Sequence, residues 1–96
     1  MKIIIEVSSS LEDAIKPSDI VIVTTQSKTP IITSNMLHPG LHINAFGADQ
    51  PGKVELDQNV VNQSLFIVDD KELVFTDGSL NVAYKNKQIS SNQIYL

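Results

Sequence analysis

The sequence predicts an α/β fold: a doubly wound parallel sheet of about four strands with helices packed on it. Two observations predict this fold. Short runs of β-branched and apolar residues recur along the chain, and stretches with helix start signals lie between them. This alternation is typical of parallel sheets, because parallel neighbours need a crossover connection, usually a helix. The expected strands are residues 3–7, 20–23, 41–46 and 65–68.

The first strand and helix are read from the N-terminal residues. The run IIIEV at 3–7 suits a strand with one buried side. Ser9 and Glu12 fit a capping box, in which the serine oxygen accepts a first-turn N–H and the carboxylate reaches back to the cap. Pro17 cannot donate a helical hydrogen bond, so we expect the helix to end near Lys16.

The middle of the chain predicts three further strands. The run IVIV at 20–23 is apolar on both faces, as a central parallel strand covered by helices requires. A loop follows it, and Ile31 and Ile32 are expected to pack back onto the core. After the strand at 41–46 we expect a loop and a helix that starts near Glu55 or Asp57.

The C-terminal part is expected to be helical on both sides of a turn. Asp69 and Asp70 can cap a helix that ends at Asp77 and Gly78. Ser90 or Ser91 is expected to cap a short last helix.

Composition excludes several function classes. The chain has 96 residues, a net charge of −4 and no cluster of Lys or Arg, so it lacks the basic patch of a nucleic-acid-binding protein. It has no Cys. Its two histidines, His38 and His42, stand on either side of a Pro-Gly turn and so do not share a helix face as a metal-binding pair would. The apolar opening is too short for a signal peptide or a membrane span, so we expect a soluble, cytoplasmic protein without metal.

The candidate site follows the strand at 41–46. Gly47 ends the apolar run and Asp49 comes two residues later. Ligands of open parallel sheets lie outside the carboxyl ends of the strands, so a carboxylate there can reach a substrate. The alternative is that Asp49 is a turn or cap residue and that the hydroxyls of the earlier loop bond only to their own backbone. Lys53 and Glu55 are expected to form a solvated charge pair, and His42 to be a packed histidine.

Three segments carry a family resemblance: SLEDAIKPSDIVIVTTQSKTPII, LHPGLHINAFGADQPGKVELD and LFIVDD. Together they resemble the second half of the cofactor domain of the ornithine cyclodeaminase and μ-crystallin family, with INAFGADQPGKVEL as the most specific part. The resemblance implies that residues 1–96 are a partial Rossmann-like domain of an NAD- or NADP-dependent, usually dimeric, amino-acid oxidoreductase or deaminase. It implies that Asp49 is the catalytic aspartate, that Thr24, Thr25 and Ser27 lie along the dinucleotide, and that the Gly47 backbone approaches the cofactor.

The sequence departs from that family in one important respect. Its four glycines, at positions 40, 47, 52 and 78, do not form the glycine-rich turn that holds a pyrophosphate. The first strands of the usual 3-2-1-4-5-6 order are missing with it. We therefore expect a fragment that is inactive alone and forms a homo-oligomer through its bare strand edges. The alternative is a small interaction module that completes its sheet with a partner chain or with itself.

Overall fold

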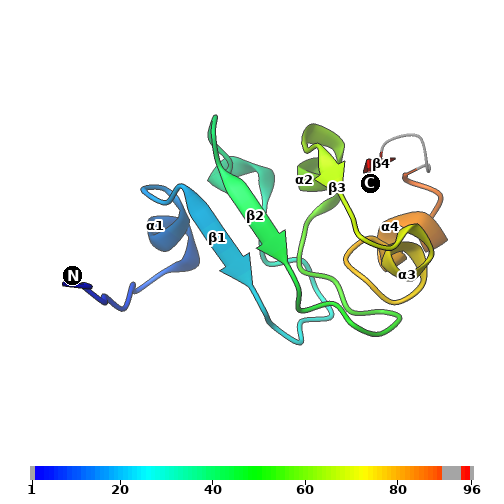
Figure 1. The fold of residues 1–96 in the computed structure, drawn as a ribbon, viewed down its shortest axis with the longest axis horizontal. Helices are drawn as coiled ribbons and strands as arrows, with labels where there is room; N and C mark the ends of the chain where they lie inside the picture. The colour runs from blue at the N-terminus through cyan, green and yellow to red at the C-terminus, as the bar shows by residue number, and fades with distance from the viewer. Residues whose placement is uncertain (1, 90–93, 96) are drawn as a thin grey trace.

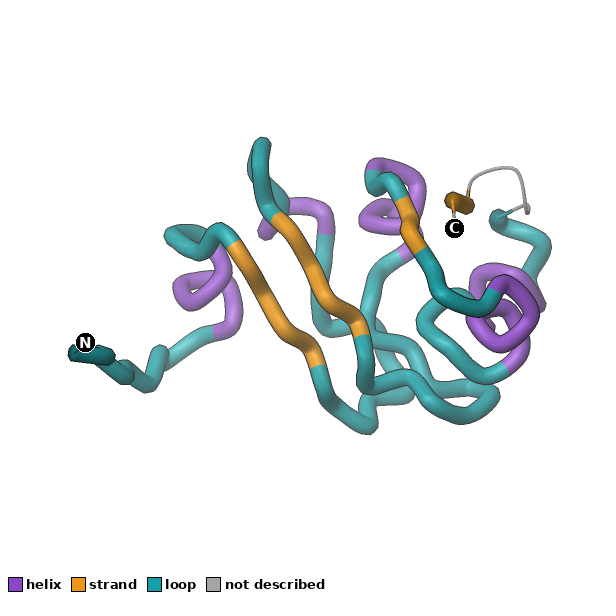
Figure 2. The backbone as a smooth tube through the Cα atoms, viewed as in Figure 1, coloured by secondary structure: helices purple, strands orange, loops and turns teal. Residues whose placement is uncertain are grey.

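The computed structural model describes residues 2–89 and 94–95 as short regular elements joined by long loops (Figures 1 and 2). None of the helices in this part of the chain is long and apolar enough to span a membrane. In chain order the elements are α1 (Leu11–Ile15), β1 (Ile20–Val23), the 3-10 turn η1 (Ser34–Met36), β2 (His42–Ala45), α2 (Gln58–Gln63), β3 (Phe66–Ile67), α3 (Lys71–Thr76), α4 (Asn81–Lys85) and β4 (Ile94–Tyr95).

The described strands form two parallel pairs. β1 pairs with β2 in the register Ile20 to His42, and β3 pairs with β4 in the register Phe66 to Ile94. These short parallel sheets with helices confirm the predicted α/β class, but the described strands form two pairs and not the single sheet of about four strands that the sequence predicted. Figure 1 shows β1 and β2 side by side, with α1 at one end of the molecule and α3 and α4 at the other.

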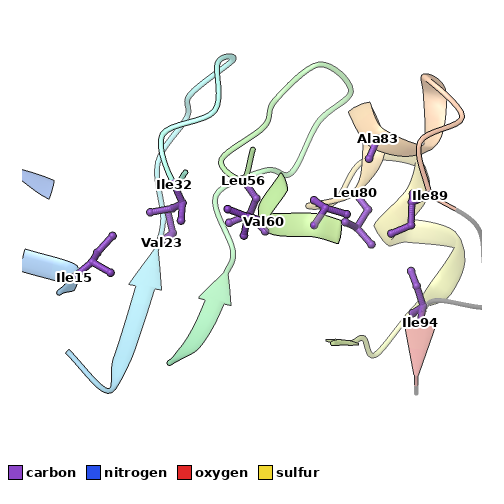
Figure 3. Close-up of a cluster of buried hydrophobic side chains, with 10 residues drawn as sticks. Ile15, Val23, Ile32, Leu56, Val60, Leu80, Ala83, Ile89 and Ile94 are labelled. Carbon is purple, nitrogen blue, oxygen red and sulfur yellow. The ribbon is translucent and has the colours of Figure 1, made fainter. Parts of the chain in front are cut away.

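One core joins these elements (Figure 3). Ile15 of α1 and Val23 of β1 pack with Ile32, which is fully buried as predicted. Leu56 and Val60 continue the core toward the C-terminal helices, where it takes in Leu80, Ala83, Ile89 and Ile94. The loop before α2 thus contributes to the core as much as the strands do.

The expected strand at 3–7 does not form. Residues 3–7 are assigned to no strand and lie apart from the sheet (Figure 1). Ile5 is 88% exposed and Val7 98% exposed. An apolar run becomes a strand only where a neighbour accepts its hydrogen bonds, and β1 has β2 as its one strand neighbour in the described part of the chain. The prediction that β1 is a central strand covered on both faces is therefore also wrong here, because Ile20 and Ile22 are 63% and 65% exposed.

Smaller expectations had mixed outcomes. α1 ends at Ile15 as expected, but its cap is Ser10, whose hydroxyl accepts the Asp13 N–H at 3.1 Å, and not Ser9. Asp70 caps α3 as predicted, by accepting the Leu73 N–H. His42 is exposed and is therefore not a packed histidine.

The C-terminal helix prediction is also corrected. Residues 94–95 form β4 and not a helix, because they pair with β3. The proposed caps Ser90 and Ser91 lie outside the described residues.

Candidate functional site

The buried carboxylate of Glu55 joins the loops that follow β1 and β2. Its Oε2 accepts the Thr25 backbone N–H at 2.7 Å and the Thr25 hydroxyl at 2.8 Å. Its Oε1 accepts the Gly47 N–H at 2.8 Å. Hydrogen bonds to a carboxylate are about twice as strong as those between neutral groups. One side chain therefore fixes the carboxyl ends of two parallel strands, which is where ligands of such sheets bind.

Backbone pairing brings Glu55 to this position. The Val54 N–H donates to the Ser27 carbonyl, and the Glu55 carbonyl accepts the N–H groups of Ile31 and Ile32. Ile32 also forms a parallel bridge with Leu56. The segment therefore runs beside the loop after β1, with Leu56 in the core and Glu55, which is 1% exposed, under the strand ends. The predicted solvated pair of Lys53 and Glu55 is wrong.

Gly47 has no room for a side chain. A Cβ atom there would lie 2.1 Å from the Thr25 carbonyl oxygen and 2.2 Å from Glu55 Oε2. The glycine is thus required by the packing of this chain's own loops.

Asp49 and Lys53 form an ion pair on the loop after β2. Lys53 Nζ lies 2.8 Å from Asp49 Oδ1, and the two side chains are 11% and 69% exposed. The hydrogen bond and the positive charge of Lys53 lower the pKa of the Asp49 carboxyl below its usual value. Asp49 is therefore a solvent-facing carboxylate that accepts hydrogen bonds at neutral pH. It is held in a turn, but its partner is a side chain and not a helix terminus.

The threonine and serine of the first loop differ in their surroundings. Thr24 is exposed, whereas Thr25 is half-buried on Glu55. The Ser27 hydroxyl donates to the Thr29 carbonyl and accepts the Thr29 N–H, as the backbone-bonded alternative predicted. Thus Thr25 and Gly47 are brought together through Glu55, while Ser27 is occupied within its own loop.

Two buried polar residues that support the site were not predicted from the sequence. Glu55 is the first, although its place between Val54 and Leu56 could have suggested a buried strand-like segment. The second is Asn81, 5% exposed, whose amide donates to the carbonyls of Lys53 and Gly78 and whose oxygen accepts the Gly52 N–H. Asn81 thereby ties the Asp49 loop to α4. Among the described residues no cluster of three or more His, Asp or Glu could hold a metal ion.

The chain matches a family of known proteins. The model of the ornithine cyclodeaminase/mu-crystallin family matches residues 1–94. The alanine dehydrogenase of Archaeoglobus fulgidus is 35% identical over 91 residues, which cover 93% of this chain and 28% of that protein.

Solved structures give the same result. An archaeal alanine dehydrogenase dimer with bound NAD has a TM-score of 0.85 and 35% identity, and covers 90% of this chain and 27% of its own. The Thermococcus litoralis Δ1-pyrroline-2-carboxylate reductase, in complex with NADH and L-proline, has a TM-score of 0.81 and 32% identity, with 91% and 27% covered. The chain thus corresponds to about a quarter of the length of these proteins.

Proposed function

We propose that this chain, which belongs to the ornithine cyclodeaminase/mu-crystallin family, forms one wall of the dinucleotide site of an amino-acid oxidoreductase or deaminase. In this proposal residues 1–96 are a partial Rossmann-like domain. Thr24, Thr25, Ser27 and Gly47 border NAD or NADP, and Asp49 faces the amino-acid substrate. The observation that carries the proposal is the carboxylate of Glu55, which fixes the two loops at the end of the sheet where dinucleotides bind.

The residues of this chain fit only part of a dinucleotide. The strand-end loops offer the exposed Thr24, but the N–H groups of Thr25, Ser27 and Gly47 are bonded within the chain, and the sequence has no glycine-rich turn for the pyrophosphate. A binding deficit of about 4 kcal/mol would weaken affinity about a thousandfold. We therefore expect the chain alone to be inactive and to bind a dinucleotide weakly.

Asp49 is the residue that we propose to meet the substrate. Its carboxylate is exposed, and Lys53 holds it on one side. When bound, a nicotinamide would supply the hydride chemistry. The contribution of this chain would be a fixed carboxylate that accepts a hydrogen bond from the substrate amine or from an attacking water.

The test is a titration of the folded chain with NADH, from micromolar to millimolar, followed by fluorescence and by saturation-transfer NMR. The absence of Trp keeps the fluorescence background low. We expect weak saturable binding that Thr24→Glu abolishes, because a carboxylate there would repel the phosphates. Thr76→Glu, at an exposed threonine of α3, is the matched control and should bind like the wild type. Saturation that is absent, or that is equal in both variants, would overturn the proposal.

A second candidate function is interaction through strand edges, in a homo-oligomer or with another chain. Two observations favour it: the apolar segment at 3–7 is exposed, and β1 has one strand neighbour in the described residues. Exposed edges and apolar surfaces mark interaction sites in soluble proteins. Sedimentation of the purified chain across a wide concentration range tests this candidate, and a single monomeric species throughout would contradict self-association.

A further inference from the structure

Residues 3–7 have no strand neighbour in the described part of the chain, and β1 has β2 on one edge only. The segment 3–7 leads into α1, which leads into β1 (Figure 1). A crossover between adjacent parallel strands needs a dozen or more residues. The connection at 8–19 is only just that long, so pairing of 3–7 with β1 of the same copy is at the lower limit of what the chain can reach. Short connections of this kind favour exchange between copies.

From these facts we propose that the chain forms a dimer in which residues 3–7 of each copy pair, in parallel, with the free edge of β1 in the other copy. This inference deepens the second candidate function and rests on it. In a single copy, residues 3–7 would pair with β1 of the same chain. In the dimer the same contacts form between two copies, which is domain swapping.

The backbone of β1 offers an edge for this pairing. The His42 and Phe46 N–H groups donate to the carbonyls of Asp19 and Val23, so these carbonyls face β2. Because consecutive residues of a strand direct their backbone groups to opposite sides, the N–H and C=O groups of Ile20 and Ile22 face away from β2. An extended segment is the partner that can satisfy such a row of donors and acceptors.

The side chains set the register of the exchanged strand. On β1, Val23 is buried and Val21 packs on the core, whereas Ile20 and Ile22 are exposed on the other face. Because strand side chains alternate between faces, a shift of one residue moves every side chain to the other face. Glu6 can remain in solvent only if it shares the face of Ile20 and Ile22. Among the registers that meet this condition, the one that pairs Ile4 with Ile20 and Ile5 with Val21 places residues 3–7 along the whole of residues 19–23 and extends the packed face, so it is the register that we propose.

The amount of exposed surface agrees with a dimer. The chain exposes 6848 Å², whereas a compact protein of 10.5 kDa is expected to expose about 5400 Å². The difference, about 1400 Å², exceeds the ~800 Å² that each partner buries in an interface of standard size. A second copy is therefore an occupant of sufficient size to cover what the monomer leaves bare.

Cysteine cross-linking tests the proposed register, since the natural chain has no thiol. Copies that carry Ile4→Cys are mixed with tagged copies that carry Ile20→Cys, and the mixture is oxidised. We expect a disulfide between the two kinds of copy, because paired strand residues lie within disulfide reach. The matched control mixes Ile5→Cys with Ile20→Cys, whose side chains would be on opposite faces and should not cross-link. Equal cross-linking in both mixtures, or none in either, would overturn the proposal.

Sedimentation of two charge variants tests the same interface without a thiol. Ile5→Asp would place a carboxylate on the packed face of the exchanged strand. We expect the dimer dissociation constant to rise about a hundredfold. Glu6→Lys changes a side chain on the solvent face and should leave the dimer intact. A wild-type monomer at every concentration, or a dimer that Ile5→Asp does not weaken, would contradict the exchange. Neither result would affect the dinucleotide proposal, which the NADH titration tests.

Discussion

Residues 3–7 and residues 53–56 reverse the usual relation between hydrophobicity and burial. The first segment, IIIEV, has three isoleucines and is exposed, whereas the second, KVEL, has two charged residues and is buried. The difference lies in their partners. The second segment pairs with the loop after β1, and its charges have acceptors and donors within reach. The first has no neighbouring strand in the described part of the chain. Burial in a small domain is thus decided by available partners as much as by side-chain polarity.

The largest expected effect is the loss of the Glu55 carboxylate. Glu55→Ala leaves the two donors of Thr25 without their acceptor, in a half-buried place, and leaves the Gly47 N–H only its longer bond of 3.2 Å to the Val23 carbonyl. Because a buried donor without a partner costs its full desolvation, we expect the free energy of unfolding to fall by about 3–5 kcal/mol. Urea denaturation followed by circular dichroism measures the change.

Two controls show whether the contrast between the segments is real. Glu55→Gln keeps one acceptor oxygen and should cost less than Glu55→Ala. Ile5→Ala removes an exposed side chain, and at concentrations where the chain is monomeric its effect should be within about 0.5 kcal/mol. An Ile5→Ala loss as large as that of Glu55→Ala would mean that residues 3–7 are packed, and the comparison would fail.

The second prediction concerns the space around Glu55. Gly47→Ala would press a Cβ atom against the Thr25 carbonyl and the Glu55 carboxylate. Overpacking of this kind is expected to destabilise the fold by about 1–3 kcal/mol. Gly40→Ala is the matched control, since a Cβ there meets no atom within 4 Å and the cost comes only from its positive φ of 86°. If Gly47→Ala unfolds at the wild-type urea concentration, the loops are not held as tightly as the Glu55 contacts indicate.

How much of the fold and of the candidate site can be predicted from the sequence depends on how far apart in the chain the interacting residues lie. The strands at 20–23 and 41–46, the cap at Asp70 and the helix after Asp57 were predicted because local spacing and cap chemistry decide them. Of the candidate site, the sequence indicated the strand-end loops and the glycine but not the carboxylate that joins them.

The burial of Glu55 depends on partners that lie elsewhere in the chain. Thr25 is thirty residues away, and no local pattern around position 55 reports that distance. The exposure of residues 3–7 was missed for the same reason, because an apolar run states a preference for burial and not the presence of a neighbour. Pairing with distant residues therefore determines whether each of the two segments, 3–7 and 53–56, is buried or exposed.

The third prediction separates the two charges of the buried segment. Lys53→Met keeps a buried apolar stem of similar length but removes the ammonium group. Because Asp49 is mostly exposed and solvent screens the ion pair, we expect little change in the free energy of unfolding. The pKa of Asp49, measured by NMR titration, should rise toward its usual value, since Lys53 is what lowers it. An unchanged Asp49 titration would show that the pair does not persist in solution.

The smallest expected effect is at the amino end of the β1–β2 pair, opposite the Glu55 contacts. His38 Nε2 lies 2.8 Å from the Ser18 carbonyl oxygen and Nδ1 lies 3.0 Å from the Pro39 carbonyl oxygen. Carbonyls only accept, so both bonds require a protonated ring. The bonds to Pro39 and Ser18, with the nearby charge of Asp19, raise the pKa of His38 above its usual value.

The sign of the pH effect follows from that direction. A raised folded-state pKa means that this stabilisation is complete below the unfolded-state pKa and is lost as the pH rises through the folded-state value. The free energy of unfolding should therefore decrease from mildly acidic to mildly alkaline pH, and His38→Gln should reduce that decrease. His42→Gln, at an exposed histidine on the neighbouring strand, should leave it unchanged. If the decrease persists in full in His38→Gln, the hydrogen bonds of His38 to the Ser18 and Pro39 carbonyls do not stabilise the fold in solution. The carboxyl ends of β1 and β2, which Glu55 joins, would then be linked more firmly than their amino ends.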